Sequence, residues 1–210
     1  MRFFFLTQTL VENFTHIGFH KSASNQTYRF YLLGSYSNVS LISPALTVSA
    51  LRRSMLILIR LLIRRHKSCI ITEKLPPYLS GKKLFRRQQY ALDYWIPGTF
   101  SNRRFSTLFR RRNARYFLRR RRVPSLVLLL GLPQKKTYDI YAETRSRGLI
   151  CVPLLDSDCD VAPYFYFIPT NTKSTTTLYF FLDIFSQVFS YSKLLAKKRF
   201  IKRVLKKRGV

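Results

Sequence analysis

Short runs of hydrophobic residues along the chain predict the strands of a buried sheet. The clearest are Ser68–Thr72, Ser125–Leu130 and Leu149–Leu154, and a further run, Tyr164–Ile168, ends at Pro169. A strand that is covered on both faces has no solvent side, so it shows a continuous hydrophobic run rather than an alternation. We therefore predict that the first three runs are neighbouring strands of a parallel sheet.

A long helix is predicted from Ser43–Pro44 to about Arg65. A hydroxyl residue followed by proline is typical of a helix start, because the side-chain oxygen can cap free amides and proline fits the first turn. The core face of this helix is expected from hydrophobic residues that recur at helical spacing: Leu51, Met55, Leu58 and Leu62.

Three further helices are expected between and after the strands. One is a basic helix over 81–93, one runs from a capping Thr137 to Gly148, and one covers 171–190. Strands that alternate with helices predict an α/β fold, in which helices cover both faces of the parallel sheet.

The N-terminal part is predicted to contain a β-hairpin. Arg29–Leu33 and Val39–Ile42 flank the polar stretch Gly34–Asn38, whose composition is typical of a turn. His16 and His20 are interpreted as part of a loop, because no carboxylate accompanies them in a metal-site spacing.

The composition narrows the class of protein. The chain has 210 residues with 38 Lys and Arg against 9 Asp and Glu, a formal net charge of +29. Its 18 Phe and 13 Tyr argue against a disordered tail, and its 3 Cys against a disulfide scaffold. No hydrophobic run reaches the length of about 18 residues that a membrane span needs. So large a charge on a folded body implies a polyanionic partner, with nucleic acid favoured over an anionic membrane surface.

The positive charge is concentrated in two blocks. Residues 103–122 contain ten Arg, residues 193–208 contain nine Lys and Arg, and neither block contains an acid. We therefore expect one α/β domain over 1–192, with an Arg-rich insert at 103–122, followed by a basic C-terminal helix or tail over 193–210.

A third cationic feature is a stripe on the long helix. At 100° per residue, four cations fall within about 60° of one another: Arg53, Arg60, Arg64 and Lys67. Contacts with phosphates are expected from this stripe, from both blocks and from the N-terminal part. The predicted RNA-binding residues are Lys21, Arg29, Arg53, Arg60, Arg64, Lys67, Arg103, Arg104, Arg110, Arg111, Arg112, Arg115, Arg119, Arg120, Lys197, Lys198 and Arg199.

The sequence contains no motif of a known enzyme class. It has neither a glycine-rich phosphate-binding loop nor a nucleophile elbow. Asp156, Asp158 and Asp160 follow a predicted strand, where alternating carboxylates could hold Mg²⁺ or cap the backbone of a turn. The turn is our prediction, so we expect no catalytic residue, metal or cofactor. Cys69 and Cys151 lie within hydrophobic runs, as small core residues do.

Six short segments follow one another in a recognisable order. Residues 94–102 (YWIPGTFSN) and 148–160 (GLICVPLLDSDCD) are the longest, and the others are 16–20 (HIGFH), 31–42, 123–130 and 167–171. In this order they resemble the motifs of the bacterial-type small-subunit ribosomal protein S-two family. The two longest are similar to that family's R-W-L-G-G-x-L-T-N and G-I-P-V-x-A-I-V-D-T-N-C-D-P.

The resemblance implies a flavodoxin-like, three-layer body with a structural role in the small ribosomal subunit. Small-subunit rRNA and neighbouring ribosomal proteins are the implied partners, without a small-molecule substrate or stable membrane insertion. The family carries a long coiled-coil hairpin where this chain has only 103–122, so a member without that hairpin is expected. The basic, aromatic-rich composition implies a mitochondrial member, with the chloroplast as the alternative.

Two other functions stay open. A peripheral protein of a membrane surface also uses basic, partly hydrophobic helices, and binding to anionic vesicles without RNA would favour it. A nucleotide-binding α/β enzyme uses the edge at which parallel strands end, and nucleotide binding in solution would favour it.

The Arg-rich insert gives a first testable prediction. Replacing Arg110, Arg111 and Arg112 together by Ala should reduce the salt dependence of RNA affinity by about two to three units of slope, because each phosphate contact contributes roughly 0.7–0.9. Incorporation of the variant into protein-depleted small subunits across a salt series measures this slope. Loss of the folded state, or an unchanged slope, would contradict the assignment.

Overall fold

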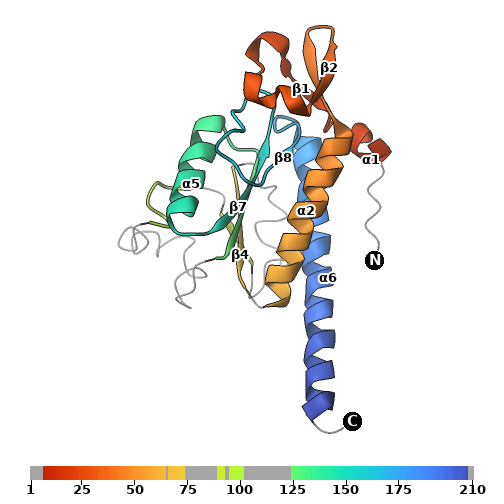
Figure 1. Ribbon diagram of the computed structural model, residues 1–210, viewed down its shortest axis with the longest axis vertical. Coiled ribbons are helices and arrows are strands. Elements are labelled where there is room, and N and C mark those ends of the chain that lie inside the picture. The colour runs from red at the N-terminus through yellow and green to blue at the C-terminus, as the bar shows by residue number, and fades with distance from the viewer. Residues whose placement is uncertain (1–6, 65, 74–88, 93–94, 102–123, 208–210) are drawn as a thin grey trace.

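The structure is a computed structural model (Figure 1), which describes residues 7–64, 66–73, 89–92, 95–101 and 124–207. Within these ranges the side chains of 89–92 and 199–207 are not described. A five-stranded parallel sheet forms the centre, in the order β5-β4-β6-β7-β8. Its strands are β4 (Ser68–Thr72), β5 (Gln89–Leu92), β6 (Leu126–Leu130), β7 (Ile150–Leu155) and β8 (Ile168–Pro169).

The strand order confirms the predicted fold class. Numbered from the first strand of the sheet, the order is 2-1-3-4-5, which is that of flavodoxin-like folds. The three hydrophobic runs predicted to be neighbours are β4, β6 and β7, and Val127 pairs with Cys69 on one side and with Cys151 on the other. Every residue of β4 and β6 is buried.

Two sequence-based elements are corrected by the pairing of the edge strands. The helix predicted over 81–93 is wrong at 89–92, which form β5 in register with β4, while 81–88 lie outside the described residues. Backbone pairing with β4 outweighs the helical pattern there. The strand predicted over Tyr164–Ile168 shrinks to Ile168–Pro169, since Tyr164 closes a turn through a hydrogen bond from its N–H to the Val161 oxygen (3.1 Å).

Helices cover both faces of the sheet. α2 (Pro44–Ile63) and α6 (Thr175–Lys207) pack side by side on one face, and α5 (Gln134–Ser146) covers the other (Figure 1). On the first face Leu58, Phe181 and Phe185 are fully buried against the sheet, and each such side chain contributes about 1.5–3 kcal/mol through burial. Among the described helices, none combines the length and hydrophobicity needed to cross a membrane.

The ends of α2 and α5 agree only in part with the capping residues predicted from the sequence. The predicted core face of α2 is buried, but the Ser43 side chain makes no capping bond, and the Ser43 carbonyl instead accepts from Thr47 N (3.1 Å). α5 begins at Gln134, so Thr137 is not its cap: it is buried inside the helix and its hydroxyl donates to the Pro133 carbonyl (3.0 Å). Gly148 follows the helix with φ +66°, as predicted.

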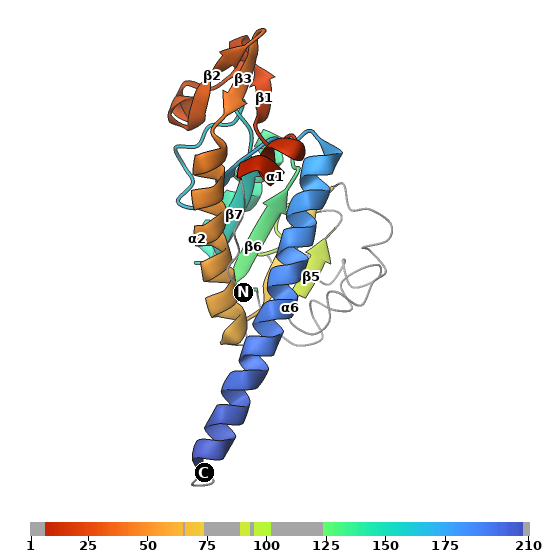
Figure 2. The same ribbon diagram turned by 90° about the vertical axis from the view of Figure 1, so that its right-hand side faces the viewer.

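α6 is longer than predicted. The helix runs without interruption from Thr175 to Lys207, through the boundary expected at 192/193, so the C-terminal block continues the core helix as far as Lys207. Asn171 precedes it, with a side-chain oxygen that accepts from Lys173 N (2.9 Å) and Ser174 N (3.2 Å). The C-terminal part of α6 projects beyond the sheet (Figures 1 and 2).

A small antiparallel sheet stands at the N-terminal side, in the order β1-β3-β2. It follows α1 (Thr7–Glu12) and comprises β1 (Ile17–His20), β2 (Leu32–Tyr36) and β3 (Val39–Ile42), with the short helices η1 (Lys21–Ala23) and η2 (Gln26–Tyr31) between β1 and β2. The predicted hairpin is confirmed, but its turn is only Ser37–Asn38, whose φ values of 45° and 64° are those of a type I′ turn. The loop predicted around His16 and His20 is wrong, because Ile17–His20 pair with β3.

Gly18 lets β1 approach two serines closely. A Cβ at this position would lie 2.6 Å from Ser40 Oγ and 2.7 Å from Ser157 Oγ. Those hydroxyls are in use: Ser40 donates to the Phe19 carbonyl (2.6 Å), and Ser157 accepts from the Phe19 N–H (2.7 Å). The glycine therefore permits the contact between the small sheet and the main body.

Replacing Gly18 by Ala should lower the free energy of unfolding by about 1–3 kcal/mol, because the methyl group must displace hydrogen-bonded serines. Gly34→Ala in β2 is the matched control, since a Cβ there meets nothing within 4 Å. Urea unfolding of both variants measures the difference. If the two variants have equal unfolding free energies, the small sheet accommodates the methyl group at position 18 without loss of stability, and the prediction is wrong.

Candidate nucleic-acid interface

The outer face of α2 carries a row of arginines. Arg53, Arg60 and Arg64 are exposed, and at 1.5 Å per residue they extend along about 16 Å of helix axis. The opposite face is held on the sheet by Leu51 and Leu58, which are fully buried. The burial of one face thus fixes the direction of the other, and these three residues form an exposed row as predicted.

Lys67 does not extend this row. α2 ends at Ile63, and Lys67, which is 8% exposed, lies where the chain enters β4, with its carbonyl accepting from Ser125 N (2.8 Å). Helical spacing does not continue beyond the end of the helix, so the predicted stripe is wrong at this residue. Arg52, which lies outside the predicted stripe, is exposed beside Arg53.

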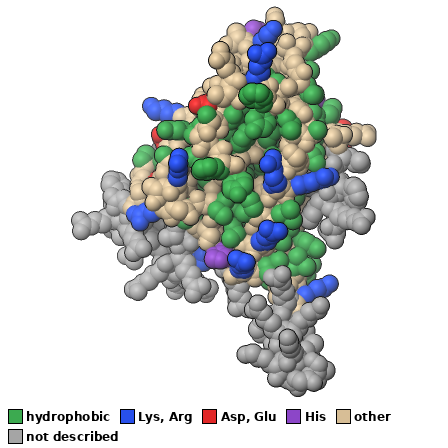
Figure 3. Space-filling model, viewed as in Figure 1, with side chains coloured by type: hydrophobic (Ala, Val, Ile, Leu, Met, Phe, Trp, Pro, Cys, Tyr) green, Lys and Arg blue, Asp and Glu red, His purple; other side chains and the backbone are tan. Residues whose placement is uncertain are grey.

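The stretch of chain that carries the row is free of acidic residues. The chain contains no Asp or Glu between Glu12 and Glu73. Figure 3 shows Lys and Arg side chains spread over this side of the molecule, with hydrophobic side chains among them. Arg53 and Arg60 have no ion-pair partner among the described residues. An unpaired, acid-free row of cations is the kind of surface that phosphates neutralise.

The other predicted contacts are spread over the chain. Lys21 and Arg29 are exposed in the N-terminal part, and Lys197 and Lys198 are exposed on α6. Arg199 belongs to α6, but its side chain is not described. The predicted contacts of the insert lie outside the described residues: Arg103, Arg104, Arg110, Arg111, Arg112, Arg115, Arg119 and Arg120.

The loop before the insert is fixed on the main body. Trp95 and Phe100 are 8% and 5% exposed and belong to the core on the α5 face of the sheet. The Glu143 carboxylate of α5 accepts hydrogen bonds from the backbone N–H groups of Gly98 (3.3 Å) and Phe100 (2.5 Å). Residues 95–101, a short distance before the insert, are therefore anchored on the main body.

The loop after β7 holds the N-terminal part in place. Thr27 donates to the Asp160 carboxylate (2.9 Å), Tyr28 donates to the Leu155 carbonyl (2.9 Å), and Asn25 N donates to the Ser157 carbonyl (2.8 Å). These bonds give the segment that carries Lys21 and Arg29 a fixed position relative to the sheet.

Asp156 is the buried member of this acidic loop. Its two carboxylate oxygens accept from the N–H groups of Ser157 (2.7 Å) and Thr172 (2.9 Å), which confirms its predicted role as a capping group. Burial raises the pKa of Asp156 to about 6, against the lowering effect of these hydrogen bonds. Because the carboxylate joins the loop to the segment before α6, its protonation affects the stability of this junction.

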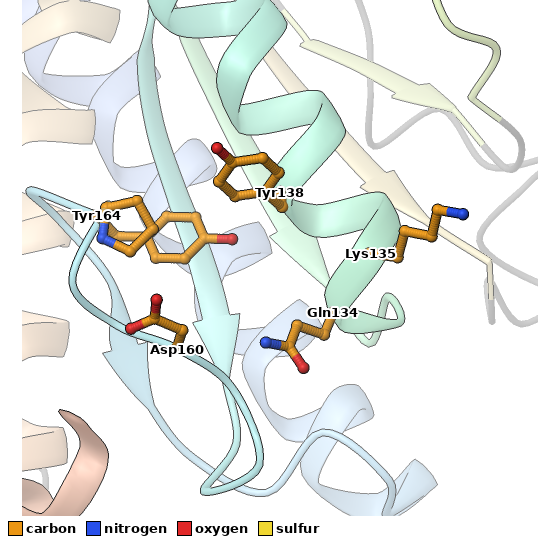
Figure 4. Close-up of a pocket in the computed structure, with 6 residues that line it drawn as sticks. Gln134, Lys135, Tyr138, Asp160 and Tyr164 are labelled. Atoms are coloured by element: carbon orange, nitrogen blue, oxygen red, sulfur yellow. The ribbon is translucent and has the colours of Figure 1, made fainter. Parts of the chain in front are cut away.

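A pocket of about 300 Å³ lies beside the start of α5 (Figure 4). Gln134, Lys135 and Tyr138 line it from the helix, and Asp160 and Tyr164 from the loop after β7. Asp160 already accepts from Thr27 and from the Ala162 N–H (3.0 Å). The carboxylate of the pocket thus serves the fold, and the pocket gives no support to the nucleotide-binding alternative.

Comparison with known proteins finds two relatives that are small ribosomal subunit proteins. No protein-family model matches the chain. It is 20% identical to "Small ribosomal subunit protein uS2m" of Acanthamoeba castellanii over 200 residues, covering 91% of this chain and 60% of that protein. It is 36% identical to "Small ribosomal subunit protein uS2c" of Chlorella vulgaris over 93 residues, covering 42% of this chain and 33% of that protein. The chain is thus similar to small ribosomal subunit proteins named uS2. It spans less than two thirds of the length of both relatives.

The two longest uS2-like segments have clear structural roles. Within 94–102, the described residues form the loop that Trp95 anchors. The segment 148–160 comprises Gly148 after α5, strand β7 and the loop that begins at Asp156. Both segments determine how other parts are positioned on the body.

Ser157 and Glu143 are the positioning residues that the sequence did not reveal. Ser157 contacts Phe19, which is 138 positions away, and Glu143 contacts Phe100, which is 43 positions away. A lone Ser in a turn and a lone Glu on a helix carry no local signal for such distant partners. Only the position of Ser157 between two aspartates marked its loop as unusual.

The raised pKa of Asp156 predicts a pH effect on stability. Its folded-state value of about 6 lies above the value of about 3.9 expected in the unfolded chain, so its contribution is greatest below pH 3.9 and is lost as the pH rises through 6. Relative to the unchanged chain, Asp156→Asn should gain about 2 kcal/mol of unfolding free energy between pH 4 and pH 7.

Urea unfolding across this pH range tests the prediction. Asp183→Asn, at an exposed carboxylate of α6, is the control. For each variant, the quantity of interest is its unfolding free energy relative to the unchanged chain. If this difference does not vary with pH for Asp156→Asn, as expected for Asp183→Asn, then Asp156 does not titrate as the structure indicates.

Proposed function

We propose that this chain is a structural component of the small subunit of a mitochondrial ribosome, where it binds rRNA and neighbouring ribosomal proteins. The observation that supports this most is the exposed, acid-free arginine row on α2 in a chain that is similar to uS2 proteins. The relatives are named small ribosomal subunit proteins, and names of that kind describe structural constituents rather than enzymes.

The mode of RNA binding follows from the kind of residues on α2. Arginines on a straight helix present charge at fixed spacing, which suits successive phosphates of a folded RNA. α2 has no aromatic side chain on which a base could stack, so recognition should depend on RNA shape and backbone. Affinity should accordingly be sensitive to salt and insensitive to base identity.

The mitochondrial location is supported by the extent of the match. The uS2m relative aligns with 91% of the chain, whereas the uS2c relative aligns with 42%, although at higher identity. Fractionation of mitochondria and chloroplasts from the source cell on sucrose gradients, with detection of this chain, tests both the particle and the organelle. The proposal fails if the chain sediments apart from small subunits, or with membranes at a salt concentration that keeps the subunits intact.

The arginine row is tested by a matched pair of double variants. Arg53→Ala with Arg60→Ala should reduce the slope of log affinity against log salt by about 1.5–2 units, because two phosphate contacts are lost. Lys135→Ala with Arg145→Ala removes the same charge from the α5 side of the sheet and should leave the slope unchanged. Binding of each purified variant to protein-depleted small subunits gives the measurement. Equal slopes for the two pairs would show that α2 is not an RNA contact.

A further inference from the structure

The small antiparallel sheet has one covered edge and one open edge. The edge formed by β1 is covered by the loop after β7, through the bond between Phe19 and Ser157. The other edge is β2, which pairs only with β3 among the described strands and lies on the outer side of the small sheet (Figures 1 and 2). Leu33, Gly34, Ser35 and Tyr36 are all exposed.

Among the described residues, β2 lacks the features that normally protect an edge strand. Natural edges are blocked by charged residues, proline or a covering segment. β2 has the sequence LLGSY, and no charged residue occurs anywhere from Phe30 to Leu51. Large hydrophobic side chains are displayed there instead: Phe30 is 87% exposed, Tyr36 75% and Leu33 69%.

The register shows which backbone groups are open. The pair next to the two-residue turn, Tyr36 and Val39, is the hydrogen-bonded pair of the hairpin, and the following pair, Ser35 and Ser40, is non-hydrogen-bonded. The N–H and C=O of Ser35 therefore point toward the open edge. An incoming strand would find a donor and an acceptor there, between the side chains of Leu33 and Tyr36.

The charges decide between possible occupants. RNA needs cations for its phosphates, and this hairpin has none. A second copy of the chain would bring together two molecules with a formal charge of +29 each. An extended segment of a different protein can pair with the backbone groups of Ser35, and hydrophobic side chains along it can pack against those exposed on β2.

We propose that β2 is a docking edge that an extended segment of a neighbouring small-subunit protein completes as a fourth strand of the small sheet. This inference rests on the proposed function, because it places the partner in the same particle. It adds a defined surface for a protein, separate from the arginine row that binds RNA.

The test uses a photoreactive benzoylphenylalanine in place of Leu33, in the full chain assembled into small subunits. Irradiation should join position 33 to a protein peptide, identified by mass spectrometry. The same group in place of Leu56, exposed among the arginines of α2, should join to rRNA. A crosslink from position 33 to rRNA, or none, in chains that are present in small subunits overturns the inference and leaves the proposed function intact. Absence of the chain from small subunits contradicts the proposed function instead.

A backbone variant separates strand pairing from mere proximity. Ser35→Pro removes the outward N–H, at an edge position that tolerates proline, and should reduce the yield of the protein crosslink about ten-fold, as expected for one lost hydrogen bond and a disturbed edge. Ser35→Ala retains the N–H and should leave the yield unchanged. Circular dichroism confirms that both variants fold. Equal yields from the two folded variants would overturn the proposed strand pairing.

Discussion

The structure depends on the burial of β4, β6 and β7 on both faces. Strands made almost wholly of hydrophobic residues require a cover on each side, and the cover on one side is the pair α2 and α6. Because Leu51 and Leu58 must face the sheet, the arginines on the other side of α2 must face solvent. The same hydrophobic requirement that closes the core thus orients the cationic surface.

The elements that the sequence predicts well are those whose signal is local. The continuous runs of β4, β6 and β7, the hydrophobic spacing of α2 and Gly148 after α5 were all readable in advance. The failures involve partners far away in sequence. The sequence of β5 has the pattern of a basic helix, and only its pairing with β4 makes it a strand. Lys67 lies at helical spacing from Arg60, although α2 has already ended at Ile63.

The cationic surface was predictable in composition but only partly in position. Charge counting identified the excess, and helical spacing correctly placed Arg53, Arg60 and Arg64. Spacing could not place the groups that hold Lys21 and Arg29, because these depend on Ser157, Asp160 and the close approach of Gly18. Charge and hydrophobic periodicity can be read from residues that are close in sequence. The hydrogen bonds that position these groups join residues that are distant in sequence and meet only in the folded structure.

Because α6 is unbroken, the C-terminal cations up to Lys207 lie on the same continuous helix as the residues that pack on the sheet. From Lys193 to Lys207 the helix axis covers about 20 Å at 1.5 Å per residue, which exceeds the screening distance of about 8 Å at physiological salt. The RNA contacts proposed for the far end of α6 and for the body are therefore electrostatically independent and lie at a fixed separation. Once one of them is bound, the other meets the same RNA at a high effective concentration, because the helix fixes the distance between them. Two modest affinities then combine as avidity, which favours a polyanion of matching shape.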